Sequence, residues 1–390
     1  MTIECDVLVV GAGPAGSSAA RSAAMNGAKT IFIDKKEEIG VPVQCAEGIG
    51  EYLFPYLPFK IPKEQLIWQM DGMYFQTDDL SVERTGDLYR SYSVERKYFD
   101  KWLSKLAIEK GAELFTNTEL KDLVLNEEYK VKIATVKKDD KTFDIKPKVL
   151  IAADGSESTV LKLLGLYNPK EGDLAEVYSW EMKNLDLYKP KLEQIFFGEF
   201  TPNGYAFIFP KSRTTANVGV GGIFPKKKME KYFEEFLEFS HVKKQIKNAE
   251  YTLEKTKKAV WNDLTDKWVF GNVLIAGDAA NQNIKPFIEG ILPSITCGSF
   301  AGKNVSKLLI ENNHTFQHYN ILNSKFEEEL SKSKEILYLM NNNFRKHNNK
   351  ENLLLFSICI NILDSSNYEK ISKLSCKKLR EHIKNSIETF

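Results

Sequence analysis

Two patterns of hydrophobic and polar positions alternate along the chain. In the first, a short segment is apolar without interruption, as in parallel strands that are covered on both faces. Segments of this type lie at residues 6–10, 30–34, 149–153 and 273–276. In the second, apolar and often aromatic residues occupy every second position, at 66–84 and 176–224, which indicates antiparallel strands. The chain therefore predicts a parallel sheet interrupted by antiparallel insertions.

Apolar residues at helical spacing predict the helices. They lie at 14–26, 94–110 and 229–247, after the strand at 273–276 as far as about Leu309, and along the Lys-rich C-terminal tail. Further strands are expected at 114–125 and 130–136. A strand, a small-residue helix and a second strand thus open the chain as a βαβ unit.

Length and charge narrow the class of protein. A chain of 390 residues exceeds the size that one hydrophobic core usually serves, so more than one domain is expected. Lys and Arg (54) nearly balance Asp and Glu (53), which argues against nucleic acid binding. The first strand leaves no room for a signal peptide, and no apolar run reaches the roughly 18 to 20 residues of a membrane span. We therefore expect a cytoplasmic protein.

Cysteine and histidine usage adds two expectations. The five cysteines are scattered without a CxxC pair, and the five histidines are dispersed. The sequence therefore predicts neither a disulfide framework nor a metal site.

A glycine-rich turn follows the first strand and fits the pattern GxGxxG. Its residues are Gly11, Ala12, Gly13, Pro14, Ala15 and Gly16. Gly11 permits the tight turn, Gly13 lets the backbone approach a pyrophosphate at the helix N-terminus, and Gly16 lets the helix pack on the sheet. Asp34 ends the second strand, where its carboxylate can accept the ribose hydroxyls of an adenosine. These elements predict a dinucleotide site.

The glycine motif does not distinguish FAD from NAD, but two later strand ends do. One strand ends in Asp154-Gly155, and another ends in Gly277-Asp278 and opens a helix at Ala279. At the carboxyl edge of the sheet Asp278 would bond a ribitol hydroxyl, and the helix would face the pyrimidine end of a flavin. Each element alone is equally consistent with a structural turn, but their order favours FAD.

Together with the segment Ser-Val-Glu-Arg that ends at Arg96, these motifs resemble the FAD-dependent family that includes para-hydroxybenzoate hydroxylase, over about residues 1–310. In that family the arginine matching Arg96 contacts FAD; a surface arginine at a helix start is the alternative. The cofactor-binding residues that the resemblance implies are Gly11, Gly13, Pro14, Ala15, Gly16, Asp34, Lys35, Cys45, Ala46, Arg96, Asp154, Gly155, Gly277, Asp278, Gly290 and Ile291.

The expected fold class is α/β, with a discontinuous Rossmann-like FAD-binding domain, an inserted antiparallel-sheet substrate domain and a C-terminal helical region. The expected boundaries are 1–65, 94–175 and 266–310 for the FAD domain, 66–93 and 176–265 for the substrate domain, and 311–390 for the helical region.

Two segments resemble the geranylgeranyl reductase branch, especially the archaeal enzymes that saturate the isoprenoid chains of membrane lipids. Residues 40–48 resemble a cysteine-containing loop that these reductases place near the flavin. Residues 205–221 resemble a Tyr-x-Trp-x-Phe-Pro…Val-Gly-x-Gly segment whose aromatics line a channel for a polyprenyl chain. The substrate contacts implied are Phe207, Phe209, Pro210 and Gly219. Any buried strand also has an aromatic or apolar residue at every second position, so a substrate channel and an ordinary buried strand both stay open as interpretations.

This chain departs from the family at two places. Phe207 stands where tryptophan is commoner, and the loop at 281–290 retains only Gly290 of a stretch that is usually glycine-rich. Backbone approach to the pyrimidine side of the flavin is therefore expected to differ.

The resemblance predicts an FAD-dependent reductase of geranylgeranyl chains. An isolated alkene has no carbonyl to take up charge, so its saturation needs hydride from reduced flavin at one carbon and a proton at the other, in a dry cavity. Cys45 is the expected proton donor or gate, and Tyr205 is an alternative donor. A small buried hydrophobe is the other interpretation of Cys45. Cys297 lies on the helix after the Gly-Asp motif and is a further candidate to approach the site.

The expected partner is an isoprenoid lipid. No second GxGxxG is present, so NAD(P)H without its own domain, ferredoxin and a quinol all stay open as electron donors. Ile371, Leu379 and Ile383 recur at helical spacing among lysines, which suits either peripheral contact with an anionic membrane or packing on the protein's own core. An FAD-dependent monooxygenase of an aromatic or apolar substrate and a non-catalytic flavin- and lipid-binding protein are the alternative functions.

Overall fold

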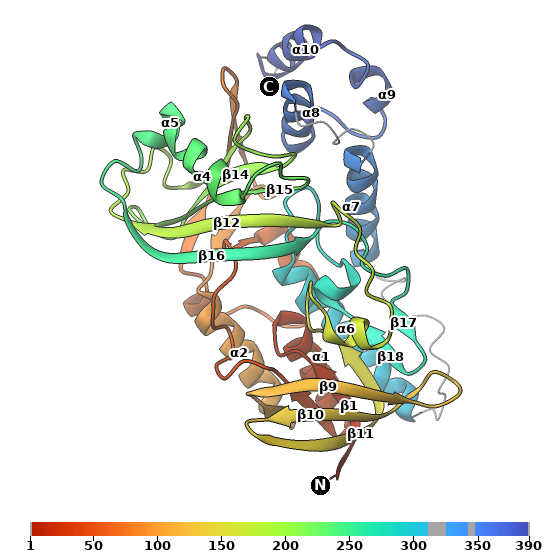
Figure 1. The fold of residues 1–390 in the computed structure, drawn as a ribbon. Helices are drawn as coiled ribbons and strands as arrows, with labels where there is room; N and C mark the ends of the chain where they lie inside the picture. The colour runs from red at the N-terminus through yellow and green to blue at the C-terminus, as the bar shows by residue number, and fades with distance from the viewer. Residues whose placement is uncertain (1, 311–324, 342–347, 389–390) are drawn as a thin grey trace.

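The computed structural model describes residues 2–310, 325–341 and 348–388, and it places two large β-sheets at opposite ends of the molecule (Figure 1). The first sheet has a parallel core in the order β18-β11-β1-β2-β8. These strands are β1 (Thr2–Val10), β2 (Thr30–Ile33), β8 (Glu113–Phe115), β11 (Lys141–Ala152) and β18 (Val273–Ile275). The four uninterrupted apolar segments therefore lie side by side, which confirms the expected parallel sheet.

The strand expected at 114–125 is in fact two strands with different partners. β8 pairs in parallel with β2, whereas β9 (Thr118–Leu125) pairs antiparallel with β10 (Val131–Lys138). Between them Asn117 has a φ of 51°, a left-handed conformation that asparagine tolerates better than most residues. The β10 strand pairs antiparallel with β11, and β17 (Val269–Phe270) pairs antiparallel with β18.

Small residues in the first helix allow close helix packing. α1 (Pro14–Met25) lies between the sheet, α2 (Arg96–Ile108) and α6 (Ile291–Ile310). A Cβ atom on Gly298 or Gly302 of α6 would lie 2.1 Å from the carbonyl oxygen of Ala15 or Ala19 respectively, so the two helix backbones are nearly in contact. The shorter helices of this half are η1 (Glu51–Tyr56), η2 (Lys63–Gln65), α3 (Thr159–Leu163) and η3 (Gly277–Ala280).

The second sheet has seven strands in the order β16-β12-β15-β14-β13-β5-β6. They are β5 (Gly72–Gln76), β6 (Ser81–Thr85), β12 (Leu174–Lys183), β13 (Leu192–Phe196), β14 (Tyr205–Pro210), β15 (Ala216–Gly222) and β16 (Glu250–Val260). All neighbours are antiparallel except β5 and β13, which run parallel. The expected antiparallel second sheet is thus confirmed, with one parallel pair inside it.

Helices α4 (Met229–Glu238) and α5 (Ser240–Lys243) pack by apolar residues on one face of this sheet. A small antiparallel sheet, β3-β7-β4, follows the loop that contains Cys45, and this loop is bonded to the second sheet because the Ala46 carbonyl oxygen accepts a hydrogen bond from Asn217. Its strands are β3 (Gly48–Gly50), β4 (Trp68–Met70) and β7 (Ser91–Ser93).

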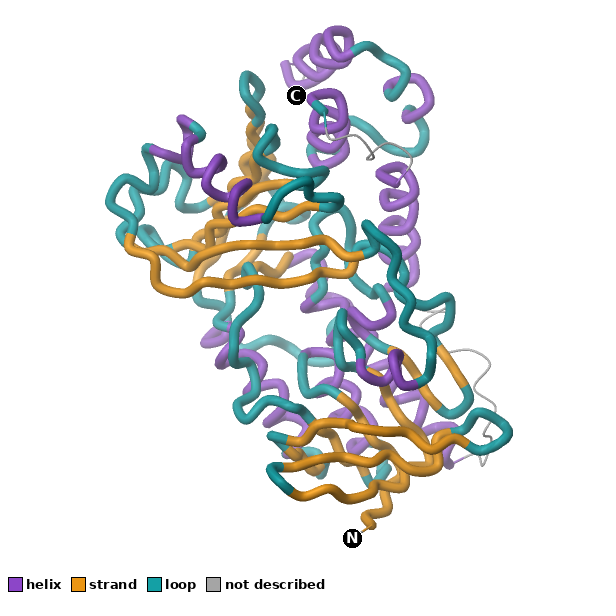
Figure 2. The backbone as a smooth tube through the Cα atoms, in the orientation of Figure 1, coloured by secondary structure: helices purple, strands orange, loops and turns teal. Residues whose placement is uncertain are grey.

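The C-terminal helices pack beside the second sheet (Figure 2). They are α7 (Lys325–Asn341), α8 (Asn349–Cys359), α9 (Tyr368–Ile371) and α10 (Cys376–Glu388). Leu379 and Ile383 of α10 are fully buried in one apolar cluster with α8, and Ile371 joins them. The apolar face of this helix is therefore already covered by the protein, which favours core packing over insertion of that face into a membrane. None of the described helices is both long enough and apolar enough to cross a membrane.

Candidate functional site

Gly11 and Gly16 of the GxGxxG motif are required by contacts within the protein, independently of any ligand. Gly11 has a φ of 98°, and a Cβ atom there would lie 2.4 Å from the carbonyl oxygen of Ala153 at the end of β11. A Cβ on Gly16 would lie 1.7 Å from the carbonyl oxygen of Gly11. These two glycines let the turn, the neighbouring strand and α1 come together.

Gly13 is different because a Cβ atom there would meet no protein atom within 4 Å. Together with Pro14 and Ala15 it borders a cavity of about 300 Å³, called here the smaller cavity, at the N-terminus of α1. The first N–H groups of a helix have no partner within the helix and suit an anion. The turn therefore has both the room and the donors for the pyrophosphate of FAD.

Asp34 and Lys35 follow β2 and also border the smaller cavity. The Asp34 carboxylate accepts hydrogen bonds from the backbone N–H groups of Ala12 (2.8 Å) and Lys36 (2.9 Å). An ionised carboxylate has about four acceptor positions, so two remain for ribose hydroxyls. Asp34 thus fits the expected role while it also holds the glycine turn against β2.

Asp154 and Gly155 border the smaller cavity, but the Asp154 side chain is engaged elsewhere. Its carboxylate accepts hydrogen bonds from the Ser158 hydroxyl (2.6 Å) and the Val160 N–H (3.0 Å), at the start of α3. Burial raises the pKa of Asp154, and these hydrogen bonds oppose the shift. Its side chain stabilises a helix N-terminus, so this segment lines the smaller cavity mainly through its backbone.

A larger cavity of about 740 Å³ lies next to the smaller one and is lined by the second large sheet, by the small sheet β3-β7-β4 and by α7 and α8. Six residues border both cavities, so the two adjoin. They are Pro14, Gln44, Arg96, Lys257, Asp278 and Ser294. The expected dinucleotide cleft therefore lies directly beside the larger space.

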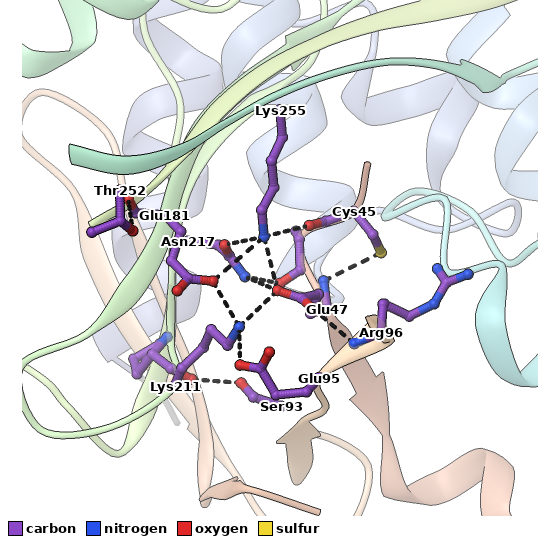
Figure 3. Close-up of polar contacts among 12 residues, drawn as sticks. Cys45, Glu47, Ser93, Glu95, Arg96, Glu181, Lys211, Asn217, Thr252 and Lys255 are labelled. Atoms are coloured by element: carbon purple, nitrogen blue, oxygen red, sulfur yellow. Dashed lines mark hydrogen bonds and ion pairs between the residues drawn. The ribbon is translucent and has the colours of Figure 1, made fainter. Parts of the chain in front are cut away.

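Cys45 and Ala46 line the larger cavity near this junction. The Cys45 sulfur accepts a hydrogen bond from the Glu47 N–H at 3.2 Å and also interacts with the Arg96 side chain (Figure 3). Arg96 forms a bidentate ion pair with Asp100 at 2.7 Å, and its side chain is only 17% exposed. Arg96 is therefore held at the junction of the cavities and is not a surface arginine at a helix start.

The aromatic segment of β14 contributes only part of the expected lining. Tyr205, Phe207 and Phe209 border the larger cavity, whereas Pro210 and Gly219 stand behind its wall. A Cβ on Gly219 would lie 2.6 Å from the Phe207 ring, so this glycine makes room for the ring rather than for substrate. The structure therefore does not place Pro210 and Gly219 where, as expected from the sequence, they would contact a substrate in the larger cavity.

The Tyr205 hydroxyl donates a hydrogen bond to the carbonyl oxygen of Phe287 at 2.8 Å. Burial raises the pKa of Tyr205 far above its ordinary value, which makes it a weak acid. Cys297 lies on α6 in the core that packs on α1 and does not border either cavity. Neither residue is placed as a ready proton donor.

The loop after Gly277 corrects one expectation about the helix. Residues 277–280 form a single 3₁₀ turn, which ends where Asn281 takes a φ of 52°, and the long helix begins only at Ile291. The helix N-terminus that faces the cavities is therefore next to Gly290 and Ile291, not at Ala279. Both residues border the larger cavity.

Asp278 lies at the junction of the two cavities, as expected for a residue that bonds the ribitol. Its carboxylate pairs with Lys257 of β16 at 3.3 Å. A Cβ on Gly290 would lie 3.0 Å from the other Asp278 oxygen, so Gly290 is needed for this close approach.

A buried charge cluster, not foreseen from the sequence, holds the Cys45 loop. The Glu47 carboxylate is 1% exposed and accepts hydrogen bonds from Lys211 (2.9 Å), Lys255 (2.8 Å) and Asn217 (3.1 Å) of the second sheet and its turns (Figure 3). Its other oxygen accepts the Arg96 N–H at 2.9 Å. Burial alone would raise the pKa of Glu47, but the two lysines hold it below its ordinary value. We call these residues, with Glu95 and Glu181, the Glu47 cluster.

Three further ionisable groups line the larger cavity: Glu193 and Lys285, which are buried, and Glu289, which is partly buried. Burial raises the pKa of both carboxyl groups to about 7 and lowers that of the Lys285 amine to about 7. Little in the sequence signals these residues, because Glu193 is followed by the polar Gln194 and the other two lie in a loop. Isolated charges within apolar segments are the pattern that would have drawn attention to these residues.

Known proteins of similar sequence are consistent with this geometry. Residues 69–284 match a family model described as an FAD binding domain, and residues 6–55 match a second model of the same description. The digeranylgeranylglycerophospholipid reductase of Methanococcus aeolicus is 37% identical over 318 residues, which cover 80% of this chain and 78% of the relative. That of Methanocaldococcus jannaschii is 37% identical over 309 residues, covering 78% and 77%.

Solved structures show the same fold. A geranylgeranyl bacteriochlorophyll reductase-like protein from Thermoplasma acidophilum superposes with a TM-score of 0.75 at 23% identity, covering 98% of this chain and 96% of that one. Halogenase PltM, solved with phloroglucinol and FAD, superposes with a TM-score of 0.70 at 14% identity, covering 98% and 92%. The sequence relatives establish the family, and the chain belongs to the geranylgeranyl reductase family of FAD-dependent oxidoreductases.

Proposed function

We propose that this protein saturates isolated double bonds in the geranylgeranyl chains of archaeal-type membrane lipids or of their precursors. The observation that carries the proposal is a largely apolar cavity of about 740 Å³ that adjoins the expected dinucleotide cleft. A long unsaturated hydrocarbon needs such a space beside the cofactor, and the family relatives bear names of reductases of this lipid class.

The residues of the smaller cavity fit the binding of FAD. Gly13 and the N-terminus of α1 would hold the pyrophosphate, Asp34 the ribose, and Asp278 the ribitol. Reduced FAD, when bound, supplies hydride. Arg96 lies at the junction of the cavities, where its charge is already balanced by Asp100.

The larger cavity would exclude water and orient the chain. Phe207, Phe209 and Tyr205 form one aromatic side, with ring centroids 4.8 Å apart for the two phenylalanines. Cys45 stands where the two cavities meet, and we assign it the role of a gate beside the reacting face. A closed apolar space strengthens every charge interaction within it and keeps reactive groups from solvent.

The physiological electron donor stays open among NAD(P)H, ferredoxin and a quinol. The test is therefore made with a chemical reductant under anaerobic conditions. Purified protein reconstituted with FAD is reduced with dithionite, mixed with a digeranylgeranylglycerophospholipid, and the lipid is analysed by mass spectrometry. Mass gains in steps of two hydrogens, together with reoxidation of the flavin, are expected.

Two other outcomes would contradict the proposal. Consumption of oxygen and reduced nicotinamide only with a smaller aromatic or apolar substrate would indicate a monooxygenase. Bound FAD and bound lipid without turnover by any reductant would indicate a non-catalytic carrier.

A further inference from the structure

Two carboxyl groups in the wall of the larger cavity have no counter-charge. Glu193 lies on β13 and is 4% exposed, and Glu289 lies in the loop directly before α6. Among the described residues neither carboxyl forms an ion pair, in contrast to Glu47 with its two lysines. Removal from water without a nearby cation raises the pKa of a carboxyl group and favours its neutral acid form.

The loop places Glu289 close to the cofactor side of the cavity. Its backbone pairs with Ile284 through two hydrogen bonds of 2.9 and 3.0 Å. The preceding residue, Ile288, has a φ of 54°, which is a strained conformation for a β-branched residue. The following residue, Gly290, lies against Asp278 at the junction of the two cavities. A strained and tightly tethered loop therefore holds Glu289 in the wall of the larger cavity, one residue from the glycine that lies against Asp278.

The surroundings of Glu289 favour its protonated form. Two hydrogen bonds, from the Gly50 N–H to one carboxyl oxygen at 2.9 Å and with the Tyr52 hydroxyl of η1, lower the pKa of Glu289 and so act against burial. Glu193 of β13 faces it across the cavity wall and disfavours a second negative charge, while Tyr205 of β14 and Glu329 of α7 lie nearby. Burial is the largest influence and raises the pKa of Glu289 to about 7.

The two donors expected from the sequence are less suitable. The Tyr205 hydroxyl already donates to the Phe287 carbonyl, and burial raises its pKa far above neutrality. The Cys45 sulfur accepts a hydrogen bond from the Glu47 N–H and faces a guanidinium group. Glu289 combines an acidic hydrogen with a position in the wall of the same cavity.

We propose that Glu289 is the acid that protonates the alkene, and that Glu193 is a positioning residue that keeps Glu289 protonated between turnovers. The assignment rests on the proposed function. The π bond of the alkene breaks, and one carbon forms a C–H bond with hydride from reduced flavin, which is oxidised by two electrons. The other carbon forms a C–H bond with the proton of the Glu289 carboxyl group, and the resulting carboxylate regains a proton from solvent.

The experiment compares Glu289→Gln with wild type in the anaerobic lipid assay. Glutamine keeps the size and the acceptor for Gly50 but cannot donate an acidic proton. We expect lipid reduction to fall by about 10²- to 10⁴-fold, the usual contribution of a general acid. The FAD dissociation constant and the reoxidation of the flavin by ferricyanide should stay unchanged, and Glu289→Asp should restore part of the rate. Glu51→Gln, which removes a partly exposed carboxylate beside Gly50, is the matched control and should behave as wild type.

The pH profile separates an acid from a residue with only a structural role. Wild-type reduction should decline as the pH rises through about 7, because the acid form of Glu289 is lost. Glu289→Gln should lack this decline in rate with rising pH. Glu193→Gln should move the decline to lower pH, because the negative charge of Glu193 raises the pKa of Glu289. Wild-type rates in Glu289→Gln, or loss of activity in Glu193→Gln alone, would overturn the assignment while leaving the reductase function intact. Wild-type protein that leaves the lipid unreduced would instead overturn the proposed function itself.

Discussion

Replacing Gly13 by alanine tests whether this glycine of the turn serves ligand binding, whereas Gly11 and Gly16 serve packing within the protein. The backbone of Gly13 has φ −71° and ψ −170°, which alanine adopts without strain. The added methyl group would meet no protein atom within 4 Å. We therefore expect the Gly13→Ala protein to fold with unchanged thermal stability, since nothing in the chain has to move.

The same methyl group would occupy the part of the smaller cavity that the pyrophosphate of FAD approaches. Overpacking of a close contact costs about 1–3 kcal/mol. Because 1.4 kcal/mol corresponds to a tenfold change, the FAD dissociation constant should rise by about 5- to 150-fold. Titration of the apoprotein with FAD, followed by the change in flavin fluorescence, measures this directly.

Gly16→Ala is the matched control. Its methyl group would lie 1.7 Å from the Gly11 carbonyl oxygen, so this variant should lose folded protein, as seen by circular dichroism. If Gly13→Ala binds FAD as tightly as wild type, the pyrophosphate does not approach Gly13, and our placement of the cofactor is wrong.

Four further perturbations test other parts of the structure. Glu47→Gln should cost up to about 3–5 kcal/mol in the free energy of unfolding, because Lys211 and Lys255 lose the buried carboxylate that they share and keep only the partners at the edge of the cluster, Glu181 and Glu95. Since the folded pKa of Glu47 is lowered, the loss should be full above pH 4.5 and shrink as the pH falls below it; urea unfolding at several pH values measures this. Glu193→Gln should have the opposite pH dependence. The pKa of Glu193 is about 7 in the folded protein against 4.5 in the unfolded chain, so the free energy of unfolding of wild type should fall by about 3 kcal/mol between pH 4.5 and pH 7, at 1.36 kcal/mol per pH unit. The variant should not show this fall. Gly219→Ala should push the Phe207 ring into the cavity and slow reduction of the lipid while FAD titration stays unchanged. Leu379→Ala should destabilise the protein by about 2–5 kcal/mol without changing co-sedimentation with anionic vesicles, because this side chain is fully buried; equal stability with weaker vesicle binding would support the membrane alternative.

The sequence was informative wherever a function depends on local geometry. The turn at Gly11, the acid at Asp34 and the uninterrupted apolar strands were all predictable, because each requirement is met within a few residues. The start of the helix after Asp278 was not predictable. The Gly277 N–H donates to the Gln282 side chain at 2.8 Å, and this side-chain hydrogen bond closes a separate turn that no periodicity reveals.

Contacts between distant segments account for the rest of what was missed. Lys255 appears in the sequence as one of several lysines on an exposed strand, yet its side chain is 2% exposed and bonded to Glu47. Glu289 lies in a loop that was expected only to differ from the family, and its surroundings come from β3, β13 and η1. Burial and partners of this kind depend on the packing of the two large sheets, which composition does not determine.

The Glu47 cluster also constrains the order in which the protein matures on the ribosome. Glu47 emerges early, but its partners Lys211 and Lys255 follow 164 and 208 residues later. The parallel sheet likewise receives β18 only after residue 273 has been made. The glycine turn and the Cys45 loop are therefore translated long before the second sheet, to which this loop is bonded. A fragment ending before β16 would keep Lys211 but lose Lys255 and β18, so the buried Glu47 carboxylate would have only one of its two lysines and the parallel sheet would lack one strand of its core.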